Sequence, residues 1–273
     1  MTARDFFRPY VLFRNWLDYP LRTHLRFRRP VDDVPPAGLD AALADLPPAE
    51  QRRARELIAA YDLARLAERG RRRDVRENLY YLDLLLTAFE HGGVALPPDR
   101  VRAADVGVSD WFYAPALHAL LRHYRTDQPR EVELLGFEAD PGRRYPDGRT
   151  REDWAAWHAD GLAGARYVPT DARRWSGAVD LATLLFPFLF TRDLDRWGLP
   201  RSLHRPVELL AHVWGCVEPG GFLVVVNQDE AERDVQRDLL AEVGAPVTWS
   251  GPFDSPFWRY EGPRFVHVAR KPG

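Results

Sequence analysis

Cysteine is nearly absent from this chain of 273 residues, with Cys216 as the one example. A single thiol cannot form an intrachain disulfide, and it excludes a zinc site built mainly from cysteines. Long hydrophobic runs are missing too, because no apolar stretch reaches the roughly 18 residues of a membrane-spanning helix. The N-terminus carries arginines and aromatic residues where a secretion signal would have an apolar core. We therefore expect a cytoplasmic protein without a membrane span.

An excess of charge of one sign is also lacking. The chain has 38 basic and 40 acidic residues and a net charge of -2, so its charge does not indicate a nucleic-acid partner. The eight histidines show no triplet at metal-ligand spacing, and we expect no metal site. Hydrophobic residues make up 45% of the chain, which is enough for a folded core and excludes disorder.

The most informative segment is a turn followed by a strand. Glu218-Pro219-Gly220-Gly221 follows a helical pattern, and the apolar run Phe222–Val226 follows the turn. Proline removes a backbone donor and ends a helix, and the two glycines permit positive φ. An unbroken apolar run is typical of a strand covered on both faces of a parallel sheet. One βαβ unit is therefore predicted here.

From residue 101 onward, short apolar runs alternate with longer amphipathic segments, which is the pattern of repeated βαβ units. We expect five parallel strands, at residues 101–108, 132–137, 165–168, 179–185 and 222–226, and helices at residues 112–124, 151–162, 206–216 and 229–243.

The last two strands have a different connection. Residues 246–250 and 264–269 are joined only by the Pro-rich and aromatic loop 251–262, so they should be antiparallel. The predicted fold class is α/β: a doubly wound, mostly parallel seven-stranded sheet with a closing antiparallel strand, in a Rossmann-like domain of residues 101–273.

Residues 1–100 carry no clear strands and are predicted to form a helical N-terminal region. Apolar spacing indicates two amphipathic helices, separated near Gly70 and ended by Gly92-Gly93. The first thirty residues interleave arginines with Phe, Tyr and Trp, which could bind nucleic acid or a membrane surface. The interpretation we favour is a helix that packs its aromatic side chains on the main domain.

The order of elements from residue 100 to 271 resembles the class I S-adenosylmethionine-dependent methyltransferases. Their first motif has an acidic residue followed by three glycines at alternate positions. This sequence matches with Asp105 and Gly107, and has Ser109 and Trp111 at the other two glycine positions. The indole of Trp111 either lines the cofactor pocket or fills the space that the methionine part of the cofactor needs.

The resemblance also implies contacts further along the chain. Glu138, at the end of the second strand, would bind the ribose hydroxyls, with Asp140 competing for this role. Asp171 and Ala172 would contact adenine, and Phe186 would line the methyl-transfer pocket. The cofactor-binding residues implied are thus Asp105, Gly107, Glu138, Asp171, Ala172 and Phe186.

The resemblance implies an S-adenosylmethionine-dependent methyltransferase with an unidentified methyl acceptor. An alternative is a protein of this fold without catalysis that serves as a binding or structural module, and a nicotinamide-dependent dehydrogenase is a third possibility. No catalytic residue is assigned, although Asp110, Asn227 and Asp229 are candidates for a base. Aromatic residues should gather at the strand ends, namely Trp111, Phe112, Tyr113, Phe186 and Phe188. The substrate-selecting rim is expected from residues 1–100, 192–205 and 251–262.

Overall fold

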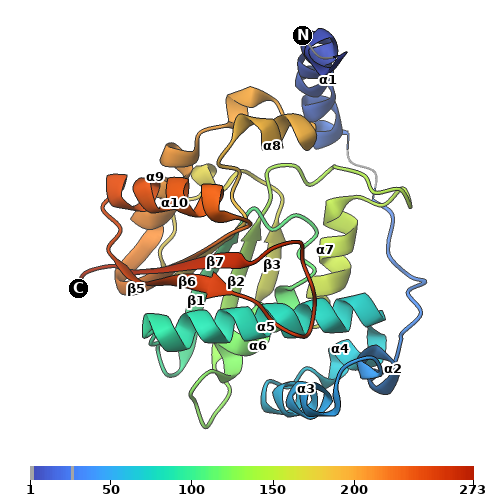
Figure 1. Cartoon of the computed structure of the whole chain (residues 1–273), viewed down its shortest axis with the longest axis vertical. Helices are drawn as coiled ribbons and strands as arrows, with labels where there is room; N and C mark the ends of the chain where they lie inside the picture. Colours follow the sequence, from blue (N-terminus) through green and yellow to red (C-terminus); the bar gives the residue numbers. More distant parts are fainter. Residues whose placement is uncertain (1–2, 26–27) are drawn as a thin grey trace.

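Seven strands form one sheet in the order β3-β2-β1-β4-β5-β7-β6 (Figure 1). The computed structural model describes residues 3–25 and 28–273, except the side chains of residues 3–8. Strands β1 to β5 pair in parallel, and β7 is antiparallel to both β5 and β6. The predicted parallel strands and antiparallel closing pair are confirmed. The strands are β1 Arg100–Val106, β2 Glu131–Phe137, β3 Ala165–Val168, β4 Val179–Leu185, β5 Val217–Asn227, β6 Val247–Phe253 and β7 Arg264–Arg270.

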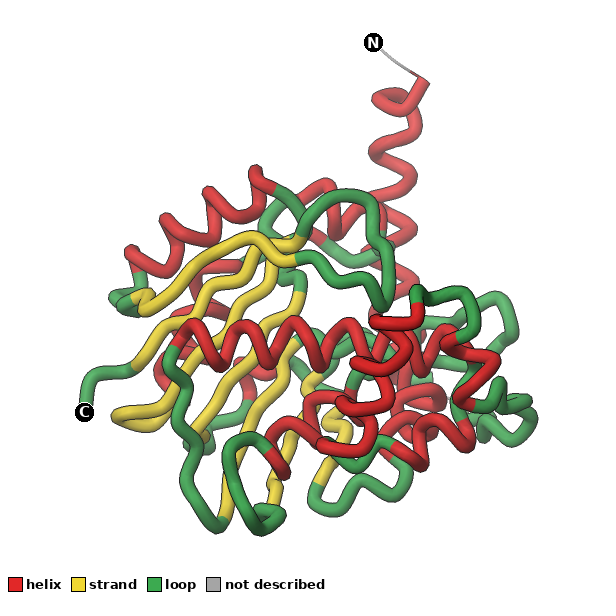
Figure 2. The backbone as a smooth tube through the Cα atoms, turned by 60° about the horizontal axis from the view of Figure 1, so that its bottom comes forward, coloured by secondary structure: helices red, strands yellow, loops and turns green. Residues whose placement is uncertain are grey.

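Helices cover both faces of the sheet (Figure 2). Val224 belongs to the buried core shared with α5 and α6, whereas its neighbours Leu223 and Val225 belong to the core shared with α9 and α10. Successive strand residues point to opposite faces, so two covered faces require a continuous apolar run. This is the physical reason for the sequence Phe222–Val226.

Each helix predicted after residue 101 is present within its expected range. The helices are α1 Ala3–His24, α2 Leu39–Leu43, α3 Pro48–Ala60, α4 Ala64–Arg69, α5 Arg72–Gly92, α6 Ala114–His123, α7 Arg151–Ala159, α8 Thr191–Arg196, α9 Pro206–Cys216 and α10 Glu230–Glu242, with short 3-10 turns η1 at Ala172–Arg174 and η2 at Arg201–Leu203.

Helix α5 packs directly on the sheet. Its last residue, Gly92, approaches β7 so closely that a Cβ there would lie 2.6 Å from Val268 Cγ1. The next residue, Gly93, has φ of 66° and ends the helix in the left-handed conformation, as the Gly-Gly pair predicted. Side chains of α2 to α5 and of the sheet belong to one hydrophobic core. A domain boundary at residue 100 stays a prediction.

The prediction of one continuous helix before Gly70 is wrong. This segment forms two helices: α3 ends at Ala60 and α4 begins at Ala64. Between them Asp62 has φ of 51°, which a helix cannot accommodate. The apolar spacing is similar on both sides of this turn, so the pattern alone did not reveal the interruption.

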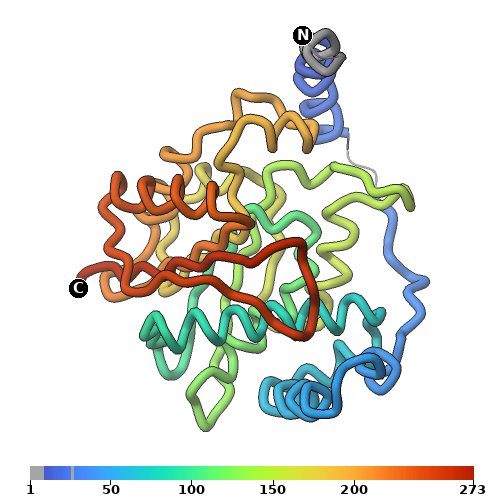
Figure 3. The backbone as a smooth tube through the Cα atoms, in the orientation of Figure 1, coloured from blue at the N-terminus to red at the C-terminus, as the bar shows by residue number. Residues whose placement is uncertain are grey.

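Helix α1 contradicts the packing that we favoured for its aromatic side chains. Tyr10, Phe13 and Trp16 are 64%, 59% and 63% exposed, so they do not pack on the main domain. The helix extends away from the body of the molecule (Figure 1), and the segment after residue 27 runs along one side to α2 (Figure 3). Phe6, Phe7 and Phe27 lie outside the described side chains. The attachment of α1 is polar: the Tyr19 hydroxyl donates to the Ala139 carbonyl at 2.9 Å, and Arg22 pairs with Asp140.

The predicted turn Glu218–Gly221 lies within β5 rather than before it, as a bulge in the pairing with β4. Both of its glycines are required, for different reasons. Gly220 has φ of 83°, in the left-handed region that favours glycine. At Gly221 a Cβ would lie 2.7 Å from the backbone oxygen of Asp180, so this position allows close approach of β4 rather than positive φ. Pairing begins before the turn, with Val179 opposite Val217, and β5 is therefore longer than the predicted strand.

Candidate functional site

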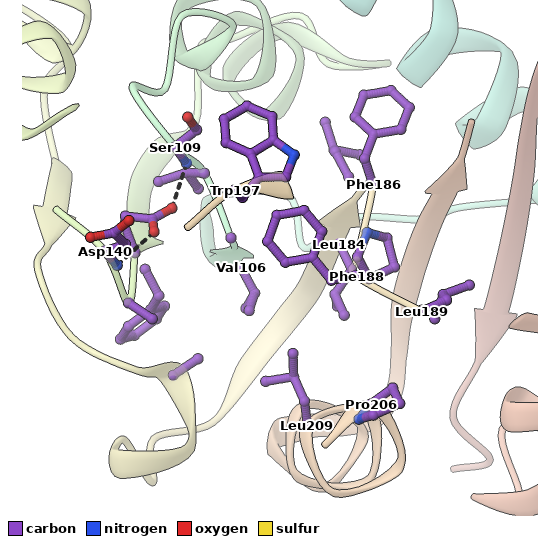
Figure 4. A pocket seen from close by; sticks show the side chains of 18 of the residues that line it. Val106, Ser109, Asp140, Leu184, Phe186, Phe188, Leu189, Trp197, Pro206 and Leu209 are labelled. Carbon is purple, nitrogen blue, oxygen red and sulfur yellow. Dashed lines mark hydrogen bonds between the residues drawn. The ribbon is translucent and has the colours of Figure 1, made fainter. Parts of the chain in front are cut away.

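A cavity of about 490 Å³ lies at the carboxyl ends of the parallel strands. Its walls come from the segments that follow β1, β2, β3 and β4, and from parts of α5, α9 and the start of β7. Ligands of open α/β sheets bind at this edge, where the strand order reverses beside β1. In Figure 4, Ser109 and Asp140 lie on one side of the cavity and Phe186 and Leu189 on the other, with Leu209 and Pro206 below.

The loop after β1 has left-handed backbone at three alternate positions. The φ angles are 79° at Gly107, 55° at Ser109 and 53° at Trp111. These are the three positions at which the methyltransferase motif has glycines, so the glycine-loop path is kept although two of its glycines are absent. No atom lies within 4 Å of a Cβ built at Gly107, so the loop faces open space there.

The indole of Trp111 does neither of the two things expected of it. It is fully buried in the core on the α5 side of the sheet, and it does not line the cavity. The ring packs on β2, where a Cβ at Gly136 would lie 2.6 Å from Trp111 Cε2. In the sequence, the sign of this packing is Gly136, because a glycine inside a strand leaves room for a large side chain to approach. The indole therefore leaves the crevice free.

Asp105 lies beneath the cavity rather than on its wall. Its carboxylate accepts hydrogen bonds from Trp111 Nε1 at 2.8 Å and Thr183 Oγ1 at 2.7 Å, and the residue is fully buried. Burial raises the pKa of Asp105 to about 6, and the hydrogen bonds from Thr183 and Trp111 act against this rise. The structure assigns this carboxylate a role in holding the loop, and direct cofactor contact, as predicted for Asp105, does not fit its position.

Glu138 follows β2 and lines the cavity, where it is 5% exposed. One oxygen, Oε1, accepts hydrogen bonds from the Asp140 amide at 2.7 Å and from Arg151 Nη1 at 2.9 Å. The other, Oε2, accepts from the Ser109 amide at 2.8 Å. Because each carboxylate oxygen has two lone pairs, Oε2 retains one for a ligand. Glu138 thus joins the loop after β1 to the segment after β2.

A chain of buried charges continues from Glu138 to helix α1. Arg151 is 3% exposed and pairs with Glu138, and Asp140 is fully buried. Arg22 of α1 donates to both oxygens of Asp140, at 2.7 and 2.8 Å, and also to the Gly198 carbonyl at 2.7 Å. Burial raises the pKa of Asp140, while Arg22 opposes this rise. Sequence reasoning missed Arg22 and Arg151, which lie far from Asp140 or Glu138 in sequence and follow no motif.

Asp171 and Ala172 form the wall contributed by the segment after β3. Ala172 begins η1 and is 6% exposed, and both residues line the cavity. The Asp171 carboxylate accepts hydrogen bonds from the amide and guanidinium of Arg173. Burial acts to raise the pKa of Asp171, but the bonds from Arg173 outweigh it and the pKa is lowered. Asp171 is therefore kept as a carboxylate that accepts hydrogen bonds.

Phe186 forms the far wall, directly after β4. Its φ is 61°, and its amide donates to the Val226 carbonyl at 2.8 Å, which fixes the chain where it leaves the sheet. Phe188 also lines the cavity, with its ring centroid 6.1 Å from that of Trp197 (Figure 4). Five predicted cofactor residues, Gly107, Glu138, Asp171, Ala172 and Phe186, therefore meet around one cavity.

Comparison with known proteins agrees with the α/β fold. No family model and no curated protein matches this sequence. A putative class I S-adenosylmethionine-dependent methyltransferase (lmo1582) from Listeria monocytogenes matches 72% of this chain and 60% of its own, with 11% identity and a TM-score of 0.50. The chain has the class I methyltransferase fold.

Two further structures are similar at lower scores. A SAM-dependent methyltransferase from Aquifex aeolicus shares 14% identity over 71% of this chain and 92% of its own, with a TM-score of 0.47. Magnesium protoporphyrin IX methyltransferase (ChlM) from Synechocystis PCC 6803, solved with bound SAM, shares 13% identity over 73% of this chain and 83% of its own, with a TM-score of 0.45.

Within this methyltransferase fold, helix α5 supplies a wall that the sequence did not predict in detail. Glu77 is 2% exposed and accepts hydrogen bonds from Arg73 at 2.8 and 3.2 Å and from the Tyr260 hydroxyl at 3.0 Å. Tyr81 lines the cavity beside Phe112, with ring centroids 5.3 Å apart. The expected rim segments 1–100, 192–205 and 251–262 all contribute to the walls, the last through Tyr260.

The candidate bases do not line the cavity. The Asn227 side chain is fully buried beside it, and Asp229 caps α10 by accepting from the Glu232 amide at 2.8 Å. Asp110 is likewise absent from the walls. In the described residues, no three His, Cys, Asp or Glu side chains are grouped to hold a metal ion. None of the helices in residues 3–25 and 28–273 has the length and hydrophobicity to cross a bilayer.

Proposed function

We propose that this chain binds S-adenosylmethionine in the cavity and transfers its methyl group to a small acceptor. The observation that carries the proposal is the loop after β1, which keeps left-handed backbone at residues 107, 109 and 111 and faces open space at Gly107. Left-handed backbone is unfavourable by about 1–2 kcal/mol at each of the two non-glycine residues, and backbone strain of this kind clusters at ligand-binding sites.

The residues present fit this cofactor. Glu138 has a lone pair on Oε2 for a ribose hydroxyl. Asp171 lies on the wall where adenine would bind, but both of its oxygens already accept hydrogen bonds from Arg173, so a bond to the adenine amino group would have to displace one of these. The aromatic wall of Phe186 and Phe188 suits a positively charged sulfonium and excludes water. When bound, the cofactor would supply an electrophilic methyl group, which leaves its sulfur as an acceptor lone pair forms the new bond. The protein's own contribution is alignment of donor and acceptor.

Calorimetry with S-adenosylhomocysteine tests the proposal. We expect saturable binding, and we expect Glu138→Ala to weaken it by about 1–3 kcal/mol, the scale of lost buried hydrogen bonds. Glu133→Gln is a matched control, because Glu133 lies on β2, the strand that Glu138 follows, but pairs with Arg100 at the surface. Since Glu138→Ala also leaves Arg151 without its partner, the melting temperature of each variant should be measured in parallel.

The result separates this proposal from its alternatives. The absence of heat at high ligand concentration would refute cofactor binding. Binding without turnover of any acceptor would favour the non-catalytic module. A dehydrogenase is disfavoured, since the doubly wound dehydrogenase sheet has the order 3-2-1-4-5-6, whereas here the antiparallel β7 lies between β5 and β6.

A further inference from the structure

Arg264, the first residue of β7, is a buried cation on the cavity wall. It is 8% exposed, and among the described residues no carboxylate forms an ion pair with it. Its Nη1 donates to the Gln228 carbonyl at 3.2 Å, whereas the buried Nε has no acceptor. Burial of a charge is unfavourable unless the charge is paired and hydrogen-bonded.

The other buried arginines of the described chain are better satisfied. Arg151 pairs with Glu138, although its Nε also lacks an acceptor, Arg76 pairs with Asp45, and Arg130 donates to three backbone carbonyls. Arg264 donates to one backbone carbonyl, and its Cζ lies 4.5 Å from the ring centroid of Tyr260 and 5.2 Å from that of Phe186. Aromatic rings attract the cation but do not neutralise it. The neighbouring carboxylate of Glu77 is already bound by Arg73 and Tyr260.

The position of Arg264 separates it from the ribose-binding end. Because β7 is antiparallel, its first residue lies at the same sheet edge as the carboxyl ends of β4 and β5. Four strand spacings separate β2, which precedes Glu138, from β7, a distance of about 19 Å. The intervening wall at this end is aromatic, with Tyr81, Phe112 and Phe186.

We propose that Arg264 binds the carboxylate of the methyl acceptor, and that this acceptor is a small aromatic carboxylic acid. The inference rests on the proposed function. Among the residues that the structure describes, none accepts a hydrogen bond from the guanidinium edge formed by Nε and Nη2, and this edge matches the two oxygens of a carboxylate. An acceptor ring would pack against the aromatic wall beside it. The ligand thus supplies the negative charge that the protein omits.

Three matched pairs of probes test this assignment: benzoate with benzamide, 4-hydroxybenzoate with 4-hydroxybenzamide, and indole-3-acetate with indole-3-acetamide. Each is titrated by calorimetry into the full chain, with and without saturating S-adenosylhomocysteine. We expect at least one carboxylate to bind tenfold or more tightly than its amide. Arg264→Met should abolish this preference, and Arg264→Lys should retain part of it.

Arg233→Met is the matched control, because Arg233 also lies over a ring, Phe265, but does not line the cavity. Arg233→Met should leave unchanged both the affinity for each probe and the preference for the carboxylate over its amide. Melting temperatures verify that the variants fold, and Arg264→Gln replaces Arg264→Met if the latter does not.

Three results would overturn the assignment: no carboxylate preference in any pair, a preference that survives in Arg264→Met or Arg264→Gln, or weaker binding of S-adenosylhomocysteine itself in these variants. The last result would assign the guanidinium to the cofactor's own carboxylate. Failure of the proposed function is seen separately, as lack of S-adenosylhomocysteine binding to the wild type. The probe titrations without S-adenosylhomocysteine then still test Arg264.

Discussion

The turn within β5, Glu218–Gly221, and the loop after β1 place similar demands on the backbone, yet they tolerate side chains differently. The turn has Gly220 at φ of 83° and Gly221 against the Asp180 carbonyl. The loop has three left-handed residues, of which only Gly107 is glycine. The other two are Ser109 and Trp111.

The difference lies in the space around each Cβ. At Gly221 the backbone of β4 occupies the position that a Cβ would take. At Ser109 the side chain reaches the cavity, and at Trp111 the indole enters the core. Left-handed backbone is unfavourable by about 1–2 kcal/mol per residue, and burial of a large aromatic side chain more than offsets this. A glycine position can therefore accept a large residue where the core has room for it.

Replacement of Trp111 should have the largest effect on this comparison. Trp111→Ala keeps the Cβ and its strain but removes the indole, so we expect a loss of about 3–5 kcal/mol in the free energy of unfolding. The loss includes the hydrogen bond to the buried Asp105. Urea unfolding measures it, with the partly exposed Trp197→Ala as control. Equal losses in the two variants would refute the anchoring role of the indole.

The carboxylate beneath the loop should make stability depend on pH. Because burial raises the pKa of Asp105 from 3.8 to about 6, the folded protein keeps this proton to a higher pH than the unfolded chain does. The contribution of Asp105 to stability is therefore lost as the pH rises from 4 to 6. Relative to wild type, Asp105→Asn should gain up to about 3 kcal/mol across this window.

Urea unfolding between pH 4 and pH 7 measures this difference. Asp238→Asn, in which a surface carboxylate is removed, should show no comparable change, since the Asp238 side chain is 78% exposed. A constant difference between Asp105→Asn and wild type would show that Asp105 does not titrate in this range.

Substitution in the turn within β5 should reduce the free energy of unfolding less than Trp111→Ala does. Gly221→Ala places a Cβ 2.7 Å from the Asp180 oxygen, so backbone must shift, and we expect a loss of about 1–3 kcal/mol in the free energy of unfolding. Gly215→Ala is the control, because a Cβ there meets no atom within 4 Å. An unchanged free energy of unfolding in Gly221→Ala would mean that β4 and β5 can separate locally.

The smallest effect is expected at Ser109. Ser109→Gly relieves the left-handed strain but increases the freedom of the unfolded chain, so a gain of at most about 1 kcal/mol should result. Ser109→Ala keeps the Cβ and should not gain. A gain in the alanine variant equal to that in the glycine variant would attribute the effect to loss of the hydroxyl instead.

Most of the sheet and half of the site could be predicted from local patterns. Phe222–Val226 reads as a strand because both of its faces are buried. Glu138 was singled out because it follows a predicted strand at the position where the resembling family binds the ribose. The role proposed for Arg264 could not be predicted, because the sequence does not show whether an arginine at the start of a strand has a carboxylate partner. The exposure of the α1 aromatic residues was mispredicted, since spacing shows an apolar face but not what covers it.

The sequence by itself determined the order of strands and helices along the chain, the glycine turn at Glu218–Gly221 and the acidic residue after β2, because each depends on neighbours within a few positions. Tertiary structure alone decided where the Trp111 indole lies, that Asp105 sits beneath the cavity, and that Arg22 and Arg151 complete the charges around Glu138 and Asp140. These outcomes depend on which atoms fill a given space, and residues far apart in the chain supply those atoms.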